Sequence, residues 1–600
     1  MTLSSTARRW RLLTAPIKSN NAPTINAAWQ EGASNPDRTN PNGSGGIYNP
    51  NSGFGTHITR STTAANGYDQ GSTNNPSIFR YNEAGNNWLA LGETNNLAKI
   101  TNYQGYMVFV RGDRGISIAG TNVVAAPTTL RVKGEINVGS VIVPLNSSGY
   151  RVIGNPFASA ISFNNVSFNG VNPGTASGYS FYMWDPKYTG TKGIGGWVTF
   201  GSLGGGKYSV TANGSGYPMD NSFTGIIESG AAFIVPASPG DFIFTESCKL
   251  TSNSTAGIAS RPAGGNEPLS KMDFFTSNLY SGTNSSAKLI DGVNVVGSSE
   301  SENEVNERDA PKLAAFNIPE FLSLKREGKK ISIEFRKNIT RNDTLFYEMG
   351  ALPNGAYQFE LIGKNIDPFV TGILVDKFAG KQEILNTNDT NRIAFDVVED
   401  ALSASADRFM VVFKSSAKFN SINAYLKEQD VSVEWVLGSE INITRHEIQR
   451  SSDGGNSFAT IDNLPGGINS FSTVQYNFTD LHPAPGNYLY RIKSVTENGV
   501  EIFSEKAAIR ILNYASPIYI APNPVADNTI HLQMNKMPAG IYSMRLLNTA
   551  GQVIQASTIN HPGTNTQHTI SIAQSTAKGS YQVELSARGR KAILLPVLIQ

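Results

Sequence analysis

Short runs of β-branched and aromatic residues, each closed by Gly, Pro, Asn or Asp, recur through most of this chain. Typical examples are GYMVFV (105–110), YRVIGNPF (150–157), GAAFIVPA (230–237) and DFIFTESCKL (241–250). No stretch shows the sustained 3.6-residue apolar period that an amphipathic helix needs. Short strand signals bounded by turn residues predict β-structure instead. We therefore expect an all-β protein without a long helix.

The length of the chain requires several such β units. At 600 residues it exceeds a single domain of about 100–200 residues. Its 58 glycines suit many short strands joined by turns. The pattern predicts tandem β-sandwich and jelly-roll domains: a sandwich at 1–255 with room for two subdomains, a linker at 256–270, a jelly-roll-like domain at 271–418, and small Ig-like sandwiches at 421–513 and 517–600.

The strand KISIEFR (330–336) illustrates the expected burial in the second domain. Strict alternation places Ile331, Ile333 and Phe335 on one face. Ser332 and Glu334 fall on the opposite face. This pattern predicts a strand with one buried and one solvated face.

Two segments lack clear strand signals. Residues 30–80 are rich in Asn, Gly, Ser and Thr, and a loop of this length either packs on a sheet or serves a surface function. The charged stretch SSESENEVNERDAPK (298–312) is expected to be a solvated loop. Neither segment identifies a site by itself.

The third block has the pattern of a small sandwich. Val431, Val433 and Trp435 alternate inward, and so do Tyr488, Tyr490 and Ile492, the latter in a strand that follows Gly-containing turns. The string WVLGSEINITRHEIQRSSDGGNSFATI, with YNFTD and GNYLYRIKSVTENG, resembles the fibronectin type III-like modules of secreted Bacteroidetes proteins. The resemblance covers the whole block and implies a scaffold.

The last block resembles the type A C-terminal sorting domain of the type IX secretion system. The matching features are Pro522-Asn523-Pro524, the turn PAGIY (538–542), LNTAG (547–551) and the closing strand that begins GSY (579–581). The end, KAILLPVLIQ, departs from the Lys-rich strand common in such domains. The resemblance implies that residues 517–600 are recognised by the type IX machinery and fold independently.

The upstream blocks carry a looser resemblance. QEGASNP, GYMVFVRGDRG, VIGNPFASAISF and FYMWDP occur in an order similar to that of large β-repeat proteins of the same secretion class. DAPKL, LVDKFAG and RFMVVF resemble a jelly-roll module that often precedes the terminal domains. These likenesses imply a surface-protein architecture and assign no catalytic residue.

Charge and cysteine content exclude several classes of function. The formal net charge is +2 and no Lys/Arg run forms a basic stripe, so nucleic acid is not an expected partner. No stretch reaches the roughly 18 apolar residues of a membrane span. The single cysteine, Cys248, excludes a disulfide framework and is expected to be a small strand residue.

Two short motifs have tempting functional interpretations. Arg111-Gly112-Asp113 matches an integrin-binding tripeptide, but it follows an apolar strand, and Gly-Asp is ordinary turn chemistry. GSLGGGKY (201–208) nearly matches a phosphate-binding loop, yet Tyr208 replaces the Ser or Thr that binds magnesium. We expect a turn in the first case and a glycine-rich hairpin in the second.

Residue patterns for catalysis and metal binding are absent from the sequence. The six histidines are dispersed without an HExxH pairing, and no Gly-x-Ser-x-Gly elbow occurs. No catalytic residue, cofactor or metal ligand is therefore assigned. A structural calcium ion stays open at the oxygen-rich turns 453–456 and 386–391, although solvated turns are favoured because the ordered ligand ladder is missing.

Four aromatic residues around a glycine-rich hairpin provide the one binding signal. They are candidates for stacking on sugar rings, against the alternative that they fill a sandwich core. These residues are Tyr182, Trp184, Tyr188 and Trp197.

Together these features predict a non-catalytic protein, secreted or held on the cell surface after type IX export, that functions in adhesion or in glycan or matrix contact. The alternative is the accessory C-terminal region of a larger secreted hydrolase. A third class, an enzyme within 1–418, would require a concave cluster of acids. The opening TARRWRLLTAPI is too short for the apolar core of a signal peptide, and we expect such a peptide to precede residue 1.

Overall fold

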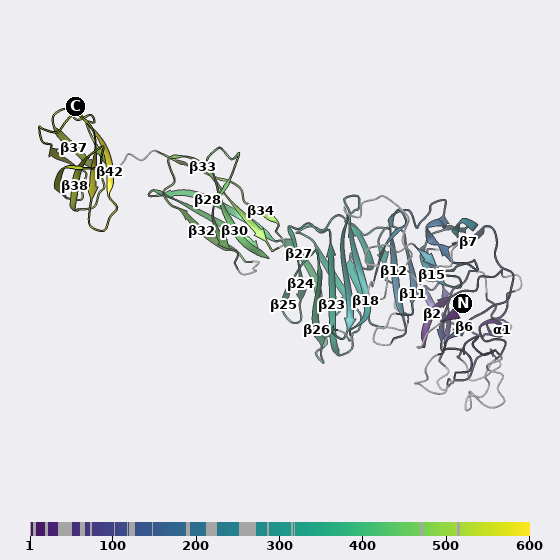
Figure 1. The fold of residues 1–600 in the computed structure, drawn as a ribbon. Coiled ribbons are helices and arrows are strands. Elements are labelled where there is room, and N and C mark those ends of the chain that lie inside the picture. Colours follow the sequence, from purple (N-terminus) through teal and green to yellow (C-terminus); the bar gives the residue numbers. More distant parts are fainter. Residues whose placement is uncertain are drawn as a thin grey trace.

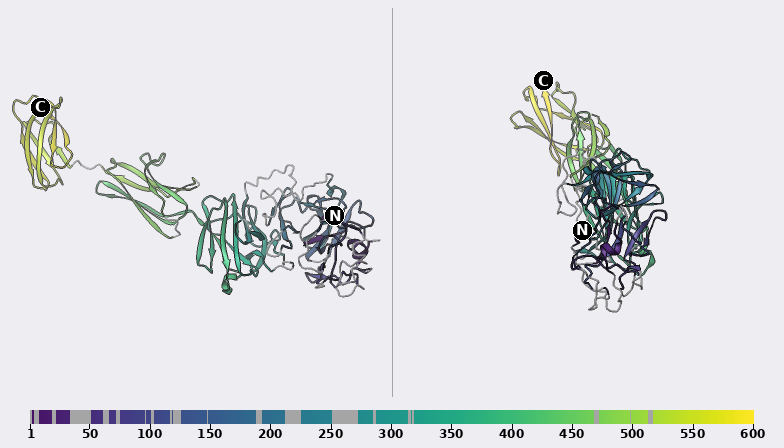
Figure 2. Two further views of the ribbon diagram at one scale, coloured as in Figure 1. Left: turned by 60° about the horizontal axis from the view of Figure 1, so that its bottom comes forward. Right: turned by 90° about the vertical axis from the view of Figure 1, so that its right-hand side faces the viewer.

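The protein is almost entirely β-structure in the computed structural model, which confirms the predicted fold class. Within the described part of the chain, α1 (Ile25–Trp29) is the one α-helix. Four β units follow one another in chain order, and the C-terminal unit stands as a body of its own (Figures 1 and 2). The structure describes residues 2–3 (backbone only), 8–18, 22–33, 51–60, 66–71, 75–95, 97–100, 103–116, 118, 126–146, 148–187, 193–211, 225–250, 272–284, 287–313, 316, 319–467, 472–497, 499–512 and 517–600.

The first unit contains three main sheets and two strand pairs. The four-stranded sheet has the order β2 (Arg9–Leu13), β5 (Tyr106–Val110), β3 (Ile78–Asn82) and β4 (Asn87–Ala90). The five-stranded sheet has the order β13 (Lys207–Val210), β12 (Gly196–Gly204), β11 (Ser180–Asp185), β15 (Ala232–Ala237) and β8 (Gly149–Gly154). The three-stranded sheet has the order β10 (Ser167–Phe168), β16 (Gly240–Phe244) and β7 (Val141–Leu145). The pairs are β1 (Thr2–Leu3) with β6 (Thr128–Thr129), and β9 (Ile161–Ser162) with β14 (Ile226–Ile227). A phenylalanine-rich core lies between the five- and three-stranded sheets.

The described parts of the 30–80 segment pack on the first unit. Asp69 is fully buried and accepts hydrogen bonds from the Ile58 amide (2.8 Å) and from both terminal nitrogens of Arg114 (2.7 Å each). Burial alone would raise the pKa of Asp69, but the Arg114 guanidinium and His57 hold it well below its usual range. This buried ion pair fixes the segment against the sheet.

The second unit is one eleven-stranded sheet that closes over a single core. The strand order is β25 (Lys381–Leu385), β24 (Val370–Asp376), β27 (Phe409–Ser415), β22 (Thr344–Met349), β20 (Leu322–Arg326), β21 (Lys329–Arg336), β18 (Lys288–Gly297), β17 (Asp273–Ser281), β23 (Gly355–Lys364) and β26 (Thr390–Val397), with β19 (Ala310–Pro311) beside β21. Leu385 and Phe395, from the two end strands of this order, share one hydrophobic cluster. The sheet therefore wraps over itself into a sandwich.

The prediction that strand 330–336 is half-buried was wrong. Ser332 and Glu334, expected on the solvated face, are buried like their apolar neighbours. The strand lies in the middle of the sheet, and Ile333 and Phe335 pack against Leu203 of the first unit. Loss of solvent on burial raises the pKa of Glu334, although the positive charges of Arg336 and Arg326 act in the opposite direction.

The first and second units are joined by shared apolar clusters and by hydrogen bonds. Leu203 packs with Phe274, Val296 and Ile333, and Phe316 packs with aromatic residues of the first unit. Asn294 Nδ2 donates to Val210 O (2.8 Å) and to Ser209 Oγ (2.9 Å). In Figure 1, β12 accordingly lies beside β18.

The stretch 298–312, predicted as a solvated loop, is only partly so. Glu302, Asn303 and Glu304 are exposed, but Asp309 and Ala310 are buried. Asp309 Oδ1 accepts from the Phe335 amide (2.7 Å). The end of this stretch also contacts the first unit, because Ala310 packs in the cluster of Leu203 and Pro311 O accepts from the Tyr182 hydroxyl (2.7 Å).

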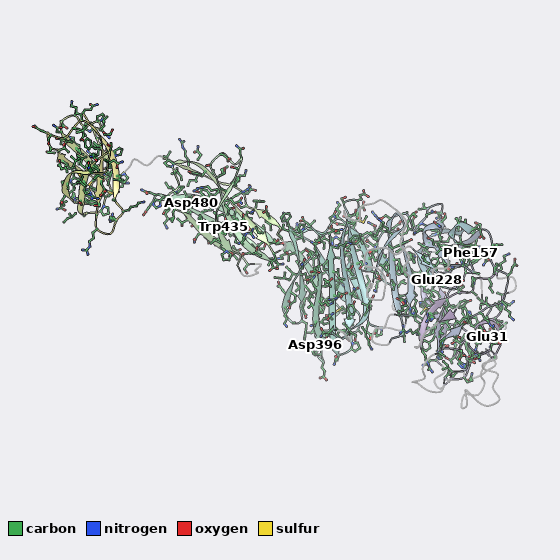
Figure 3. All side chains as sticks on the ribbon, viewed as in Figure 1. Glu31, Phe157, Glu228, Asp396, Trp435 and Asp480 are labelled. Atoms are coloured by element: carbon green, nitrogen blue, oxygen red, sulfur yellow. The ribbon has the colours of Figure 1, made fainter. Side chains whose placement is uncertain are left out.

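The third unit is a small sandwich of two sheets. One sheet contains β28 (Ala417–Lys427), β29 (Asp430–Glu440) and β32 (Val474–Asp480); the other contains β31 (Ala459–Pro465), β30 (Ile443–Ser451), β33 (Gly486–Thr496), β34 (Glu501–Phe503) and β35 (Ala507–Ile511). Val431, Val433 and Trp435 are buried as predicted, and so are Tyr490 and Ile492. Tyr488 is half-buried against the same core. Figure 3 marks Trp435 and Asp480 in this unit.

A single residue separates the last strand of the second unit from the first strand of the third. That residue, Ser416, donates its amide to Phe369 O (3.0 Å) and accepts from the Ile441 amide (2.7 Å). Its hydroxyl also bonds the Thr371 hydroxyl (2.7 Å). Residues of both units are therefore hydrogen-bonded directly to the residue between them.

The C-terminal unit is a second small sandwich with its own core. One sheet contains β36 (Ile518–Ile520), β37 (Thr529–Met534) and β40 (Thr566–Ser571), and the other contains β39 (Val553–His561), β38 (Gly540–Asn548), β41 (Gly579–Ser586) and β42 (Ile593–Ile599). Its hydrophobic cluster runs from Ile518 to Ile599 and shares no residue with the cluster of the third unit.

Candidate aromatic binding site

An aromatic pocket opens where the first unit meets the second. It has a volume of about 300 Å³. Its wall consists of six aromatic rings, two amide side chains and two aliphatic residues: Phe79, Tyr81, Trp88, Tyr150, Trp197, Phe316, Asn86, Asn87, Ile234 and Leu313. We refer to this site as the aromatic pocket.

Two antiparallel strand pairs place most of its rings. Tyr81 on β3 lies directly opposite Trp88 on β4, so both side chains stand on one face of the sheet. Their ring centroids are 5.2 Å apart at an angle of 70°. On the neighbouring sheet Trp197 lies opposite Trp184, with centroids 5.1 Å apart at 87°. Edge-to-face contacts of this kind favour one ring arrangement.

The two sheets meet at a pair of tryptophans. The rings of Trp88 and Trp197 are 6.3 Å apart and nearly parallel, at 20°. Phe316, which follows β19 in the second unit, closes the base with its centroid 5.5 Å from Trp88. The pocket is therefore built from residues far apart in the sequence, and its shape depends on the contact between the two units.

The polar side of the pocket is the turn between β3 and β4. Asn86 takes a left-handed backbone conformation (φ 49°), which asparagine tolerates well. Its side-chain oxygen accepts from the Tyr81 hydroxyl, and the Asn87 oxygen accepts from Asn82 Nδ2 (3.1 Å). Burial raises the pKa of Tyr81 to about 12, helped by Tyr150 and Glu83, so its hydroxyl is uncharged near neutral pH.

The four residues that the sequence suggested for stacking on sugar rings differ in their exposure and position. Tyr182 is 0% exposed and donates its hydroxyl to Pro311 O (2.7 Å), and Trp184 is 6% exposed in the same cluster. These two residues support the junction and offer no open ring face. Tyr188 lies outside the described residues, and Trp197 lines the aromatic pocket.

Sequence reasoning missed Tyr81, Trp88 and Tyr150. The signal for the first two was present in FRYNEAGNNWLAL, because two alternating runs flank a Gly-Asn turn and place aromatics across from each other. Assigning residues up to 80 to a loop obscured this hairpin. Tyr150 had no local signal, since only the sheet packing brings it to the pocket.

The tripeptide at 111–113 is held in a turn against the fold. The Arg111 guanidinium donates to His57 O and to Thr59 Oγ1, both at 3.3 Å. Burial lowers the pKa of Arg111 to about 10. Asp113 accepts from the amides of Gly53 (2.8 Å) and Gly115 (3.0 Å). Both charged side chains thus serve local structure, in line with the predicted turn.

The glycine-rich sequence 201–208 forms the predicted hairpin. β12 and β13 pair in antiparallel fashion, and Gly205 and Gly206 connect them with φ values of +60° and +77°. Two successive positive φ angles suit the right-handed twist of a tight hairpin and favour glycine. No helix begins there to receive a phosphate.

Cys248 is not a strand residue, contrary to the sequence prediction. It closes the short 3-10 helix Glu246–Cys248, is fully buried, and donates its thiol to Asn165 O (3.0 Å). The turn begins at Thr245, whose side chain caps it. The alternation before Phe244 did not reveal that the strand ends there.

The two candidate calcium turns are closed by their own hydrogen bonds. Asp453 accepts from the hydroxyls of Ser451 and Ser457, both at 2.6 Å. Asn391 Oδ1 accepts from the Asn386 amide (2.8 Å). Across the described ranges, no three His, Cys, Asp or Glu side chains come together as a metal site.

A serine, a histidine and a carboxylate come together in the third unit. His446 Nε2 donates to Glu440 Oε1 (2.9 Å), and Ser494 Oγ lies 2.8 Å from His446 Nδ1. Burial lowers the pKa of His446 despite Glu440, so the ring is neutral. All three residues are at most 1% exposed, so a substrate has no access, and the set acts as a buried polar network.

The histidines of the last unit are closer than their sequence spacing suggested. His561 Nδ1 lies 3.0 Å from His568 Nε2 across the β39–β40 turn. The pKa of His568 is lowered by burial and by His561. With two ligands in place and no third acidic, His or Cys side chain among the described residues, the pair does not make a metal site.

The C-terminal unit has a family match. Residues 518–595 match the family described as the secretion system C-terminal sorting domain. This segment is a type IX sorting tail. Its presence means that the protein is secreted or placed on the outer surface by the type IX system. In the described residues, no helix is long and apolar enough to cross a membrane.

Other comparisons show only remote likeness. Pectate lyase Pel3 from Pectobacterium carotovorum is 19% identical over 18% of this chain (TM-score 0.12), and a tetra-tandem repeat of a large adhesion protein is 12% identical over 54% of this chain and 90% of its own (TM-score 0.15). Chicken CNTN1 FN1–FN3 domains are 9% identical over 54% of this chain and 89% of theirs (TM-score 0.15). No curated protein matches.

The chain spans a minority of the first two solved proteins. It covers 30% of Pel3 and 39% of a β-1,2-glucanase from Parabacteroides distasonis, the latter at 10% identity and a TM-score of 0.12. At such scores the likenesses say nothing of ligand or activity.

Proposed function

We propose that this protein is a non-catalytic contact protein of the bacterial exterior, which is exported by its tail and holds a glycan or matrix surface through the aromatic pocket. The observation that carries the proposal is the pocket itself, where Trp88 and Trp197 from two sheets meet Phe316 from the second unit. Rings that are already packed lose little freedom on binding, which favours affinity.

The other units have supporting roles in this proposal. The two-sheet sandwich of 417–511, with three strands in one sheet and five in the other, supports a fibronectin type III-like spacer, as in secreted Bacteroidetes proteins. Residues 517–600 are the part that the type IX machinery recognises. Domains at 1–255, 271–418, 421–513 and 517–600 fit these roles, and the contact function belongs to the first two.

Retention of the purified full chain on immobilised surfaces tests the proposal. We expect binding to at least one surface in a panel of polysaccharides and protein coats. The double variant Trp88→Ala/Trp197→Ala should reduce retention at least about tenfold, since large aromatic anchors dominate contact energies. Tyr425→Ala, at an exposed ring in the third unit, is the matched control and should bind normally.

Two results would contradict the proposal. One is retention that the tryptophan variant leaves unchanged. The other is turnover of a bound polysaccharide by the wild-type chain, which would favour a hydrolase and require a catalytic centre.

A further inference from the structure

The aromatic pocket combines ring surfaces with hydrogen-bonding groups that carry no charge. From this composition we infer that its ligand is a neutral sugar unit, a pyranose without carboxylate, sulfate or phosphate, at the end of a glycan chain. The inference rests on the proposed contact function and makes it specific to one chemical class.

The apolar part of the pocket suits one face of a sugar ring. Tyr81, Trp88 and Trp197 are each half-buried, so part of every ring is packed and part is open. Phe316 packs against Trp88 with ring centroids 5.5 Å apart, and Trp184 packs against Trp197 with centroids 5.1 Å apart. A pyranose presents C–H groups on its face, and the negative face of an aromatic ring attracts such weakly positive hydrogens.

The polar part suits hydroxyl groups. Asn86 and Asn87 are exposed at the rim, and their oxygens already accept bonds from Tyr81 and Asn82. For neither amide nitrogen does the structure record an acceptor among the described residues. Two adjacent NH₂ groups beside stacked rings therefore offer donors to the hydroxyls of a sugar.

The charges around the pocket argue against an acidic sugar. None of the lining residues is ionised near neutral pH, because burial raises the pKa of Tyr150 as well as that of Tyr81. Three cations adjoin lining residues in the sequence, and none is free to face the pocket. Arg151 pairs with Glu83, Lys312 pairs with Asp291, and Arg80 is exposed on the face of β3 opposite Phe79 and Tyr81. A carboxylate in the pocket would lose water without gaining a cationic partner, which is costly.

The size of the pocket limits the ligand to a chain end. Its volume of about 300 Å³ lies at the lower end of the range for small-molecule sites. A long polysaccharide segment needs an extended groove with rings in a row. Here the rings converge on one hollow, and Phe316 closes its base.

Titration calorimetry of the full chain with defined oligosaccharides tests the inference. The probes are neutral gluco-, manno-, galacto- and N-acetylglucosamine oligomers, and galacturonate and mannuronate oligomers of equal length. We expect at least one neutral series to bind, with an affinity that does not grow beyond two or three units. Asn87→Ala, at an exposed residue, should weaken binding by roughly threefold to tenfold through the loss of one hydrogen bond.

Trp197→Phe keeps an aromatic ring and should retain part of the affinity, whereas Trp197→Ala should lose it at least about tenfold. Tyr425→Ala is again the unaffected control, and a thermal melt of each variant establishes that it is folded. Because Asn87→Ala removes no packing, it keeps the test decisive even where a tryptophan variant unfolds.

The outcomes separate the inference from the proposed function. Preference for uronate oligomers overturns the inference and leaves glycan contact standing. Absence of sugar binding, together with surface retention that still depends on Trp88 and Trp197, also overturns the inference only. Absence of both binding and tryptophan-dependent retention overturns the two together.

Discussion

The first unit and the C-terminal sorting tail bury their apolar surfaces in different ways. The first unit has apolar surface on β11, β12 and β15 that its own strands β2 and β5 cover in part and that the second unit completes, through Phe316 and Phe335. The sorting tail encloses its own core and shares no cluster residue with its neighbour. The sorting tail, which the export machinery recognises, thus has a core that needs no neighbour. The first unit forms the aromatic pocket together with the second unit and therefore depends on their contact.

The largest expected effect comes from removing the tail. Deleting residues 517–600 should abolish appearance of the protein outside the cell, while residues 1–512 keep their melting temperature because no core residue is lost. Cell fractionation and calorimetry measure the two effects. A passive reporter with a signal peptide, fused to 517–600, should in turn be exported. A truncated protein that unfolds, or that still reaches the exterior, would remove the contrast between the two ends.

The second expected effect tests the coupling of the first two units. Phe316→Ala should destabilise the protein by about 3–5 kcal/mol, since a buried ring is lost from a packed cluster. Both units should then melt together at a lower temperature. Trp435→Ala, at a ring that is also buried but lies in the third unit, is the comparison and should lower only that unit's transition. Separate shifts of the first and second units after Phe316→Ala would show that they are independent.

A smaller effect concerns acid sensitivity in the tail. Burial and His561 lower the pKa of His568, so the folded state disfavours its protonated form. As pH falls below the ordinary histidine value of about 6.5, the unfolded tail takes up a proton more readily, and stability is lost between that value and the folded pKa. Unfolding of the full chain in urea at pH 7.5 and at pH 5.5, followed by proteolytic cleavage within the tail, should show that the tail unfolds at a lower urea concentration at pH 5.5. His568→Gln should weaken the pH dependence, and an unchanged slope would contradict the assignment.

The smallest effect is expected at the tripeptide 111–113. Asp113→Glu lengthens a side chain that bonds two amides and should change stability by no more than about 1 kcal/mol. Adhesion of integrin-bearing cells should not change, because Arg111 is tied to the fold. Cell-attachment assays with a scrambled-peptide control measure this. Loss of attachment by a folded variant would give the first unit a second contact site.

The sequence was sufficient for local features and insufficient for contacts between units. Val431, Val433 and Trp435 alternate into a core formed within their own sandwich, so their burial could be predicted. Ser332 and Glu334 show the same alternation, but their second face is covered as well, and period-two patterning contains no information about a distant sheet.

The candidate site follows the same rule. Trp197 was found because its Gly-rich hairpin is a local signal, and Tyr81 with Trp88 could have been found from theirs. Tyr150 and Phe316 reach the pocket only through packing between sheets and units. Tyr182 and Trp184 share the sheet face of Trp197 but are buried within its apolar cluster, whereas Trp197 stays partly open, a difference that composition alone does not reveal.

The one-residue joint at Ser416 has a mechanical consequence. In the proposed contact function the protein is attached to a matrix, and a pull on that attachment puts the chain under tension along its length. At this joint the chain passes from β27 to β28, while bonds to Phe369, Thr371 and Ile441 clamp the residue between them. A pull is therefore shared among several hydrogen bonds on both sandwiches before either sheet begins to unravel.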